Sequence, residues 1–356
     1  GNDGEFKGDA KVIDSDLALG VPIPDLNLRA ALEKALGKNE GDVITDAELA
    51  TLTELYASGS SIADLTGLEH CTGLTKCWLP EQQINDISAV ANLTNLTELW
   101  LNHNLISDIS AVANLTSLTT LGLYGNESSD ISVLANLTNL TELDISGNKK
   151  ISDISVLANL TKLTKLSLYN SEIVSDISAL ANLINLTKLR LWYNQISDIS
   201  PLANLTNLTE LSLGSNQIND ISPLSNLTNL VDLSLNYNQL MNLDGLANLT
   251  GLISLNLWST LANLGNQTGD ISALANLTSL TALWISGNEI SDISPLSNLT
   301  NLKELDLDNN KISDITAIAN LTKLINLELH DNYISNVSPL IENTGILGRI
   351  TLKNNP

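Results

Sequence analysis

One pattern of 22 residues recurs along almost the whole chain. Thirteen units run from Leu52 to Ile346, and a shortened fourteenth follows. Nine units have 22 residues, three have 23 and one has 28. A clean unit, residues 186–207, reads LTKLRLWYNQISDISPLANLTN, and its residues are numbered here as positions 1 to 22. Such a repeat predicts a solenoid, because one unit cannot bury its own leucines and must stack on its neighbours.

The spacing within a unit predicts one strand and one return path. Positions 4 and 6 are apolar while positions 3, 5 and 7 vary, which indicates a half-buried strand over positions 3 to 7. Strands that always run the same way form a parallel sheet. Ser-Pro pairs on the return path, such as Ser200-Pro201, predict short 3₁₀ turns with serine as the N-cap. We therefore expect an α/β right-handed solenoid with a concave parallel sheet, with strand centres near Leu99, Leu121, Leu143, Leu166, Leu189 and Leu211.

Two polar columns belong to this scaffold. Position 9 is asparagine in ten units, including Asn104, Asn194, Asn310 and Asn355, where an inward amide can bond to backbone groups of the turn. Position 13 is aspartate in eleven units, which indicates an acceptor for backbone N–H groups. These residues are Asp64, Asp86, Asp108, Asp130, Asp153, Asp176, Asp198, Asp220, Asp270, Asp292 and Asp314.

The chain divides into three parts. Residues 1–20 are polar and irregular and are expected to form a flexible tail. Residues 21–51 should form a helical cap, with helices within 25–36 and 45–50. Gly37 would end the first helix, and Thr45 with Glu48 would form a capping box on the second. Residues 52–356 are the solenoid.

Composition excludes several classes of function. The net charge of −23 disfavours nucleic acid as a partner. No run of 18 or more apolar residues is present, so membrane insertion is not expected. No phosphate loop, zinc motif or Ser-His-Asp arrangement is readable, so we expect no catalysis, no cofactor and no metal. Cys71 and Cys77 replace leucine at core positions, either as buried thiols or as a disulfide.

The tryptophan and tyrosine side chains form the main functional signal. The chain has five Trp and six Tyr, and all lie in a strand or in the turn just after it. Positions 5 and 7 should point out of the concave sheet, so these rings indicate a binding surface. Three groups are expected along the chain: Tyr56, Trp78 and Trp100 with His103 and Tyr124; Tyr169, Arg190, Trp192, Tyr193 and Tyr237; and Trp258 with Trp284. Tyr333 stands apart, at position 10.

Two further features are open to more than one interpretation. Asp306, Asp308, Glu328, His330 and Asp331 form an acidic cluster, which is either a solvated face or a carboxylate pair able to bind a cation or serve a glycosidase. We expect the solvated face, because an open sheet offers no pocket that would raise a carboxyl pKa. The 28-residue unit carries an insertion between Thr260 and Asp270, which is either a tolerated loop or part of a binding face.

The units resemble the 22-residue leucine-rich repeat of internalins, and the motif NxISDISPLANLTNLTxL carries the resemblance over nearly all of residues 52–356. The resemblance implies a secreted or surface-anchored bacterial protein whose concave sheet binds a protein on a host or neighbouring cell. Two alternatives stay open: a module that stacks glycans on its rings, and the recognition region of a larger enzyme.

Overall fold

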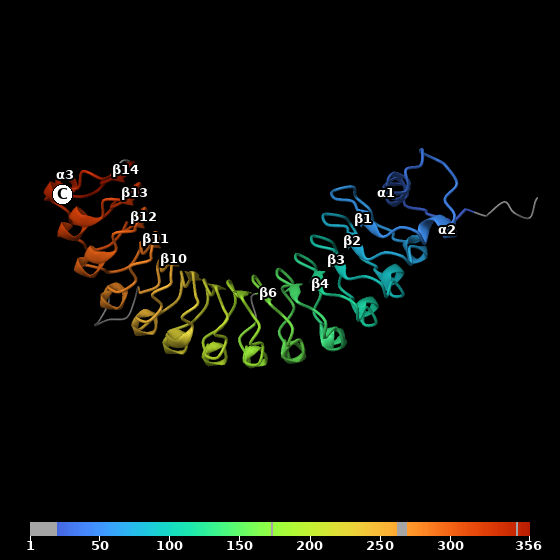
Figure 1. Ribbon diagram of the computed structural model, residues 1–356, viewed down its shortest axis with the longest axis horizontal. Coiled ribbons are helices and arrows are strands. Elements are labelled where there is room, and N and C mark those ends of the chain that lie inside the picture. Colours follow the sequence, from blue (N-terminus) through green and yellow to red (C-terminus); the bar gives the residue numbers. More distant parts are fainter. Residues whose placement is uncertain (1–19, 172–173, 262–268, 347) are drawn as a thin grey trace, which may run out of the picture.

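The computed structural model describes residues 20–171, 174–261, 269–346 and 348–356. These residues form one arc of stacked repeats with the strands on its inner side and short helical turns on its outer side (Figure 1). The leucine-rich-repeat solenoid with a concave parallel sheet is therefore confirmed. Residues 1–19 of the expected tail and residues 262–268 of the insertion lie outside the described residues.

The inner side of the arc is one sheet of fourteen parallel strands in sequence order. Each predicted strand centre is the middle residue of a strand. The strands are β1 Glu54–Tyr56, β2 Lys76–Trp78, β3 Glu98–Trp100, β4 Thr120–Gly122, β5 Glu142–Asp144, β6 Lys165–Ser167, β7 Lys188–Arg190, β8 Glu210–Ser212, β9 Asp232–Ser234, β10 Ser254–Asn256, β11 Ala282–Trp284, β12 Glu304–Asp306, β13 Asn326–Glu328 and β14 Arg349–Thr351.

The regular strand is shorter than the sequence predicted, covering positions 3 to 5 rather than 3 to 7. Backbone pairing nevertheless continues: the Leu191 N–H donates to the Ser212 carbonyl at 2.8 Å, and the Tyr193 N–H donates to the Gly214 carbonyl at 2.9 Å. Tyr193, at position 8, has a φ of 56°. This left-handed conformation turns the chain and ends the extended segment.

Short 3₁₀ helices cover the convex side. They are residues 68–70, 88–90, 110–112, 132–136, 155–159, 178–180, 200–202, 222–226, 244–246, 272–274, 294–298 and 316–320, and the short α-helix α3, Ser338–Glu342, replaces the turn of the thirteenth unit.

The prediction that serine is the N-cap of these turns is wrong. Ser200 is the first residue of its turn, Ile199 precedes it, and no side chain of the N-cap residue makes a capping bond. The Asp198 carboxylate performs that task instead, accepting from the Ser200 N–H at 2.8 Å. The same bond recurs along the aspartate column, which confirms its expected role as a backbone acceptor.

The interior is a continuous core of leucine and isoleucine crossed by a ladder of buried asparagines. Asn216 is typical: its amide nitrogen donates to the carbonyls of Leu191 at 3.0 Å and Leu213 at 2.9 Å, and its oxygen accepts from the Ile196 N–H at 3.0 Å. The asparagine column therefore joins adjacent repeats, as expected. Cys71 and Cys77 are buried and free, so the alternative of buried thiols is the one observed.

Two helices close the amino-terminal end of the core. Helix α1, Leu26–Leu36, buries Leu28 and Leu32 and ends at Gly37, whose φ is 69°. Helix α2, Asp46–Leu49, has the predicted capping box between Thr45 and Glu48. Both helices thus lie where the sequence placed them. Within the described residues, no helix combines the length and the apolar character that crossing a membrane requires.

Candidate binding surface

The pleat of the sheet separates core residues from surface residues. In β7 and the segment after it, Leu189 and Leu191 are fully buried, Arg190 is exposed and Trp192 is partly exposed. Positions 5 and 7 of every unit therefore face the concave side, and the turn at positions 8 to 10 forms its rim. We call the following set the concave aromatic surface: Tyr56, Trp78, Trp100, His103, Tyr124, Tyr169, Arg190, Trp192, Tyr193, Tyr237, Trp258 and Trp284.

The rings on this surface differ in how far they reach solvent. Six of the eleven Trp and Tyr side chains are exposed: Tyr56, Trp78, Tyr193, Tyr237, Trp258 and Tyr333. The other five, Trp100, Tyr124, Tyr169, Trp192 and Trp284, are only partly exposed. Rings at the same repeat position are thus unequal, because neighbouring side chains cover some of them.

The first group of rings lies on three adjacent strands. Tyr56, Trp78 and Trp100 are register partners on β1, β2 and β3. Their ring centroids are separated by 5.2 Å and 6.0 Å, and both pairs meet edge to face. Trp100 then leans over Gly122 on β4, where a Cβ would lie 2.1 Å from its Cε3 atom.

The second group is a continuous series of rings from His103 to Tyr193. The His103 and Tyr124 centroids are 4.5 Å apart, Tyr124 and Tyr169 are 5.5 Å apart, and Tyr169 stacks on Trp192 at 4.4 Å. Tyr193 meets Trp192 at 5.3 Å. The predicted grouping is therefore wrong in two respects. His103 and Tyr124 contact the middle group, and Tyr237 contacts Trp258 at 5.2 Å instead of the middle group.

Small side chains in the fifth unit allow this series to continue. Tyr124 and Tyr169 belong to the fourth and sixth units, and they meet across Ser146 and Gly147 of the unit between them. A Cβ on Gly147 would lie 3.0 Å from the Tyr124 Cε2 atom. A larger residue there would separate the two rings.

A partly buried carboxylate lies among these rings. Asp144 is at position 5 of the fifth unit, and its Oδ1 accepts from the Ser146 N–H at 3.0 Å. Burial raises the pKa of Asp144 above its ordinary value. Burial, and then the nearby Asp144 carboxylate, raise the pKa of Tyr169 to about 12. The surface thus combines apolar ring faces with carboxylate and phenol groups.

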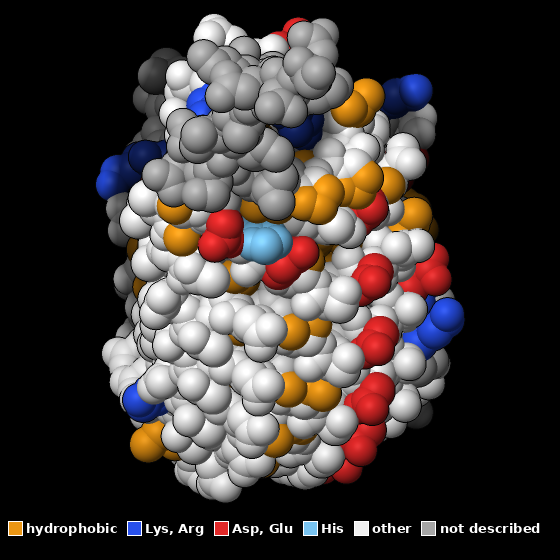
Figure 2. All heavy atoms as spheres, turned by 90° about the vertical axis from the view of Figure 1, so that its right-hand side faces the viewer, with side chains coloured by type: hydrophobic (Ala, Val, Ile, Leu, Met, Phe, Trp, Pro, Cys, Tyr) orange, Lys and Arg blue, Asp and Glu red, His pale blue; other side chains and the backbone are white. Residues whose placement is uncertain are grey.

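Acidic side chains outnumber basic ones in the chain, with 40 Asp and Glu against 17 Lys and Arg. In the view from the amino-terminal end, acidic side chains line one side of the molecule and basic ones are scattered (Figure 2). On the concave face, Lys188 pairs with Glu210 at 2.5 Å, and Arg190 lies 3.9 Å from the same glutamate.

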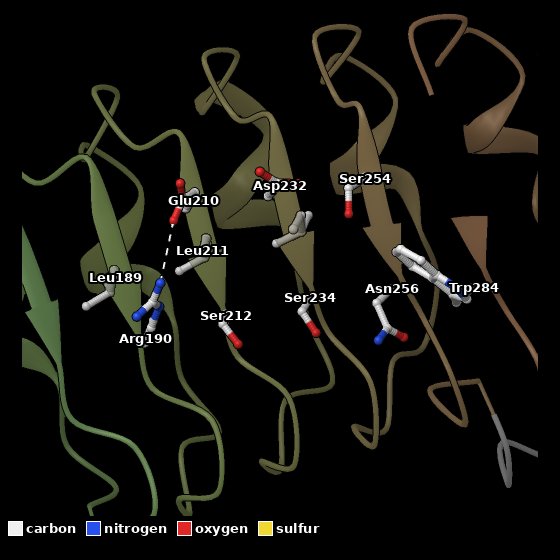
Figure 3. A pocket seen from close by; sticks show the side chains of 11 residues that line it. Leu189, Arg190, Glu210, Leu211, Ser212, Asp232, Ser234, Ser254, Asn256 and Trp284 are labelled. Carbon is white, nitrogen blue, oxygen red and sulfur yellow. Dashed lines mark ion pairs between the residues drawn. The ribbon is translucent and has the colours of Figure 1, made fainter. Parts of the chain in front are cut away.

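On the carboxyl-terminal side of Arg190, the concave face contains a hollow of about 420 Å³, which we call the central depression. Arg190 and Glu210 border it on the amino-terminal side, and the Trp284 indole reaches from β11 across β10 on the other (Figure 3). Ser212 and Ser234 form its floor. The repeat pattern alone does not predict this depression. Its signal is readable: units eight and nine have small or short side chains at both concave positions, namely Ser212 with Gly214 and Ser234 with Asn236.

The acidic cluster lies on the last strands. Asp306 on β12 and Glu328 on β13 are register partners, as expected. The expectation that no carboxyl pKa would be raised there is wrong, because burial raises the pKa of both Asp306 and Asp308. Side chains of the neighbouring strands provide that burial even on an open sheet.

The ligand atoms of Asp308, Glu328 and His330 lie within 4.8 Å of one another. However, the His330 Nδ1 atom accepts from the Lys353 N–H at 3.1 Å, which places the proton of a neutral imidazole on Nε2. That atom lies 3.7 Å from a Glu328 oxygen. The Nδ1 atom is therefore engaged by the backbone, and the distance from Nε2 to Glu328 is longer than a hydrogen bond.

The arc, its sheet and its repeated polar columns define the class of protein as a leucine-rich-repeat solenoid. The sequence profile described as "Leucine Rich repeats (2 copies)" matches residues 94–136, 138–182, 184–226, 278–320 and 300–342. The chain belongs to the internalin-type leucine-rich-repeat family. This fold supports a protein–protein interaction module, and the family is a non-enzymatic binding scaffold.

Three similar proteins illustrate the relationship. The internalin InlF of Listeria monocytogenes is 40% identical, with 92% of this chain and 95% of that chain covered and a TM-score of 0.87. A leucine-rich-repeat protein of Leptospira interrogans is 26% identical, with 83% and 76% covered and a TM-score of 0.75. Internalin J of Listeria monocytogenes is 47% identical over 53 residues, which span 15% of this chain and 6% of that protein.

Proposed function

We propose that the chain is the protein-binding module of a secreted or cell-surface bacterial adhesin, and that it holds its partner on the concave aromatic surface. The partner is a protein displayed on a host or neighbouring cell. The observation that carries the proposal is the gathering of all the Trp and Tyr side chains on one face and its rim, with six of them exposed.

Exposed rings of this kind are unfavourable in water, and a partner that covers them gains the free energy of their burial. Tryptophan and tyrosine are also the residues that most often act as anchors in protein interfaces. The internalin relatives from Listeria monocytogenes favour a bacterial surface protein. We assign the acidic cluster, Asp306, Asp308, Glu328, His330 and Asp331, a secondary role toward basic side chains of the partner.

Two rings are suited to a test because they are exposed. Trp78 is 39% exposed and Tyr193 is 54% exposed. Replacing Trp192 is less informative, because its ring is only partly exposed and lies face to face on Tyr169 at 4.4 Å. We expect Trp78→Ala or Tyr193→Ala to weaken binding at least about tenfold, as the loss of an interface anchor does. The melting temperature should stay almost unchanged.

The measurement is capture of surface-labelled host-cell membrane proteins on the immobilised chain, followed by surface plasmon resonance with the captured protein. Met241→Ala is the matched control, since Met241 is 59% exposed but lies at position 12, beyond the concave rim. A partner that binds both ring variants at wild-type strength would show that the concave aromatic surface is not the site.

A further inference from the structure

We propose that the central depression, which shares Arg190 and Trp284 with the concave aromatic surface, binds a neutral oligosaccharide with one sugar ring packed against the indole of Trp284. The volume of about 420 Å³ lies within the usual range of small-ligand sites, about 300–1,000 Å³. The depression extends from β7 to β11, roughly 19 Å at the spacing of parallel strands, so it fits an elongated ligand. This inference does not depend on the proposed function.

Trp284 is the aromatic wall of the site. Within the described part of the chain its indole makes no contact with another aromatic ring, whereas Trp78, Trp100, Trp192 and Trp258 each do. Its side chain extends over β10 towards the depression (Figure 3). The electron-rich face of an indole attracts the weakly positive C–H groups on one side of a sugar ring.

The polar groups that border the depression suit sugar hydroxyls. Among the described residues, no hydrogen bond or ion pair engages the Asp232 carboxylate or the hydroxyls of Ser212 and Ser254. The Asn256 amide oxygen accepts from the Trp258 N–H at 3.0 Å, so the two N–H donors of that amide are available to a ligand. A sugar hydroxyl donates and accepts, so it can satisfy this mixture of carboxylate, hydroxyl and amide groups.

Charge favours a neutral ligand. Arg190 is within 3.9 Å of Glu210, so the one basic group of the site already has an acidic neighbour. Asp232 adds a negative charge, and the whole chain carries −23. An acidic polysaccharide would be repelled over this surface.

Backbone pairing disfavours a peptide bound as an added strand. Strands β7 to β11 are paired on both sides, so the floor offers no free row of N–H and carbonyl groups. A peptide would need such a row to bind as an additional strand. The side chains of the depression are therefore its recognition groups.

The test is titration of the whole chain with maltotriose, cellotriose, tri-N-acetylchitotriose and N-acetyllactosamine, followed by NMR or calorimetry. We expect at least one of them to bind, Trp284→Ala to weaken it at least about tenfold, and Asp232→Asn to weaken it several-fold. Ser212→Trp, which fills the depression, should abolish binding. Tyr333→Ala, which removes an exposed ring outside both the depression and the concave aromatic surface, is the control and should change the affinity less than about twofold.

The melting temperature of each variant is measured to establish that the variant is folded. Absence of binding by all four sugars up to about 20 mM would overturn the proposal. So would equal losses in Trp284→Ala and Tyr333→Ala. If no sugar binds but Ser212→Trp abolishes capture of the protein partner, the depression belongs to the protein interface, and the proposed function stands without the sugar site.

Discussion

At the scale of single residues, the concave surface depends on glycines as much as on rings. His103 lies over Gly125, where a Cβ would be 2.8 Å from its Nδ1 atom, and Trp258 lies beside Gly287, where a Cβ would be 3.3 Å from its Cδ1 atom. Together with Trp100 over Gly122 and Tyr124 over Gly147, these pairs share one geometry: a ring of one repeat rests on a glycine of the next. Replacing such a glycine with a residue that has a Cβ would therefore displace the ring that rests on it.

We predict that Gly122→Ala will destabilise the chain by about 1–3 kcal/mol, the usual penalty for adding atoms to a filled site. The new Cβ would lie 2.1 Å from the Cε3 atom of Trp100, so that ring must be displaced. Urea unfolding and near-ultraviolet circular dichroism measure the two effects. Gly251→Ala is the control, because its Cβ would meet only ordinary contacts at 3.4 Å and 3.5 Å. Equal behaviour of both variants would contradict the packing of Trp100 on Gly122.

At the scale of elements, most of the 3₁₀ turns follow an aspartate carboxylate that accepts a backbone N–H, and Asn242 takes that place before the turn 244–246. The pKa is lowered for eight of the eleven position-13 aspartates by hydrogen bonds from the Ser or Thr two residues later: Asp64, Asp108, Asp130, Asp153, Asp176, Asp198, Asp270 and Asp314. A folded-state pKa below the unfolded value stabilises the fold above about pH 4, and this stabilisation is lost as the pH falls through the folded-state pKa. Asp144, Asp306 and Asp308 have raised pKa values and act in the opposite direction, but they are fewer.

We therefore predict that the melting temperature falls steeply when the pH drops below about 4. Asp198→Ala should lose about 0.5–1 kcal/mol at pH 7, as expected for removal of a capping side chain, and much less near pH 3. Thermal unfolding over a pH series measures both. A variant that loses the same stability at both pH values would show that the bond from Ser200 to the ionised carboxylate does not stabilise the turn.

At the scale of the whole molecule, the chain is a line of repeats in which each unit packs only on its neighbours. The core is continuous from α1 to the last strands, so its amino-terminal end needs the cover that α1 provides. Loss of that cover should loosen the nearest units first, because distant units keep all their own contacts.

We predict that Leu32→Ala, which removes a fully buried side chain of α1, will destabilise the cap by about 2–5 kcal/mol. Hydrogen exchange should then accelerate in β1 to β3 and stay unchanged in β11 to β13. Leu26→Ala in the same helix is the control, since Leu26 is 77% exposed. Uniform acceleration along the chain would mean that the solenoid unfolds as one cooperative unit.

The structural features that recur at the same position in many units could be predicted from the sequence. The strand centres, the asparagine ladder and the aspartate bonds each recur in ten or more units, so one pattern accounts for all of them. It also placed the rings on the concave face. The direction of each ring and the burial of Asp306 depend on which residues stand side by side in adjacent units. Those features belong to pairs of repeats, and a position-by-position comparison does not reveal them.

The contacts between rings and glycines also limit how such a chain can change its length. Trp100 and its supporting Gly122 belong to different units, as do Tyr124 and Gly147. Inserting a unit between the two, or deleting the unit that carries the glycine, would leave the leucine core intact but would set the ring against an unsuitable neighbour. Gain or loss of repeats is therefore tolerated by the scaffold more readily than by the surface. An engineer who moves a ring into another solenoid should transfer two consecutive units together.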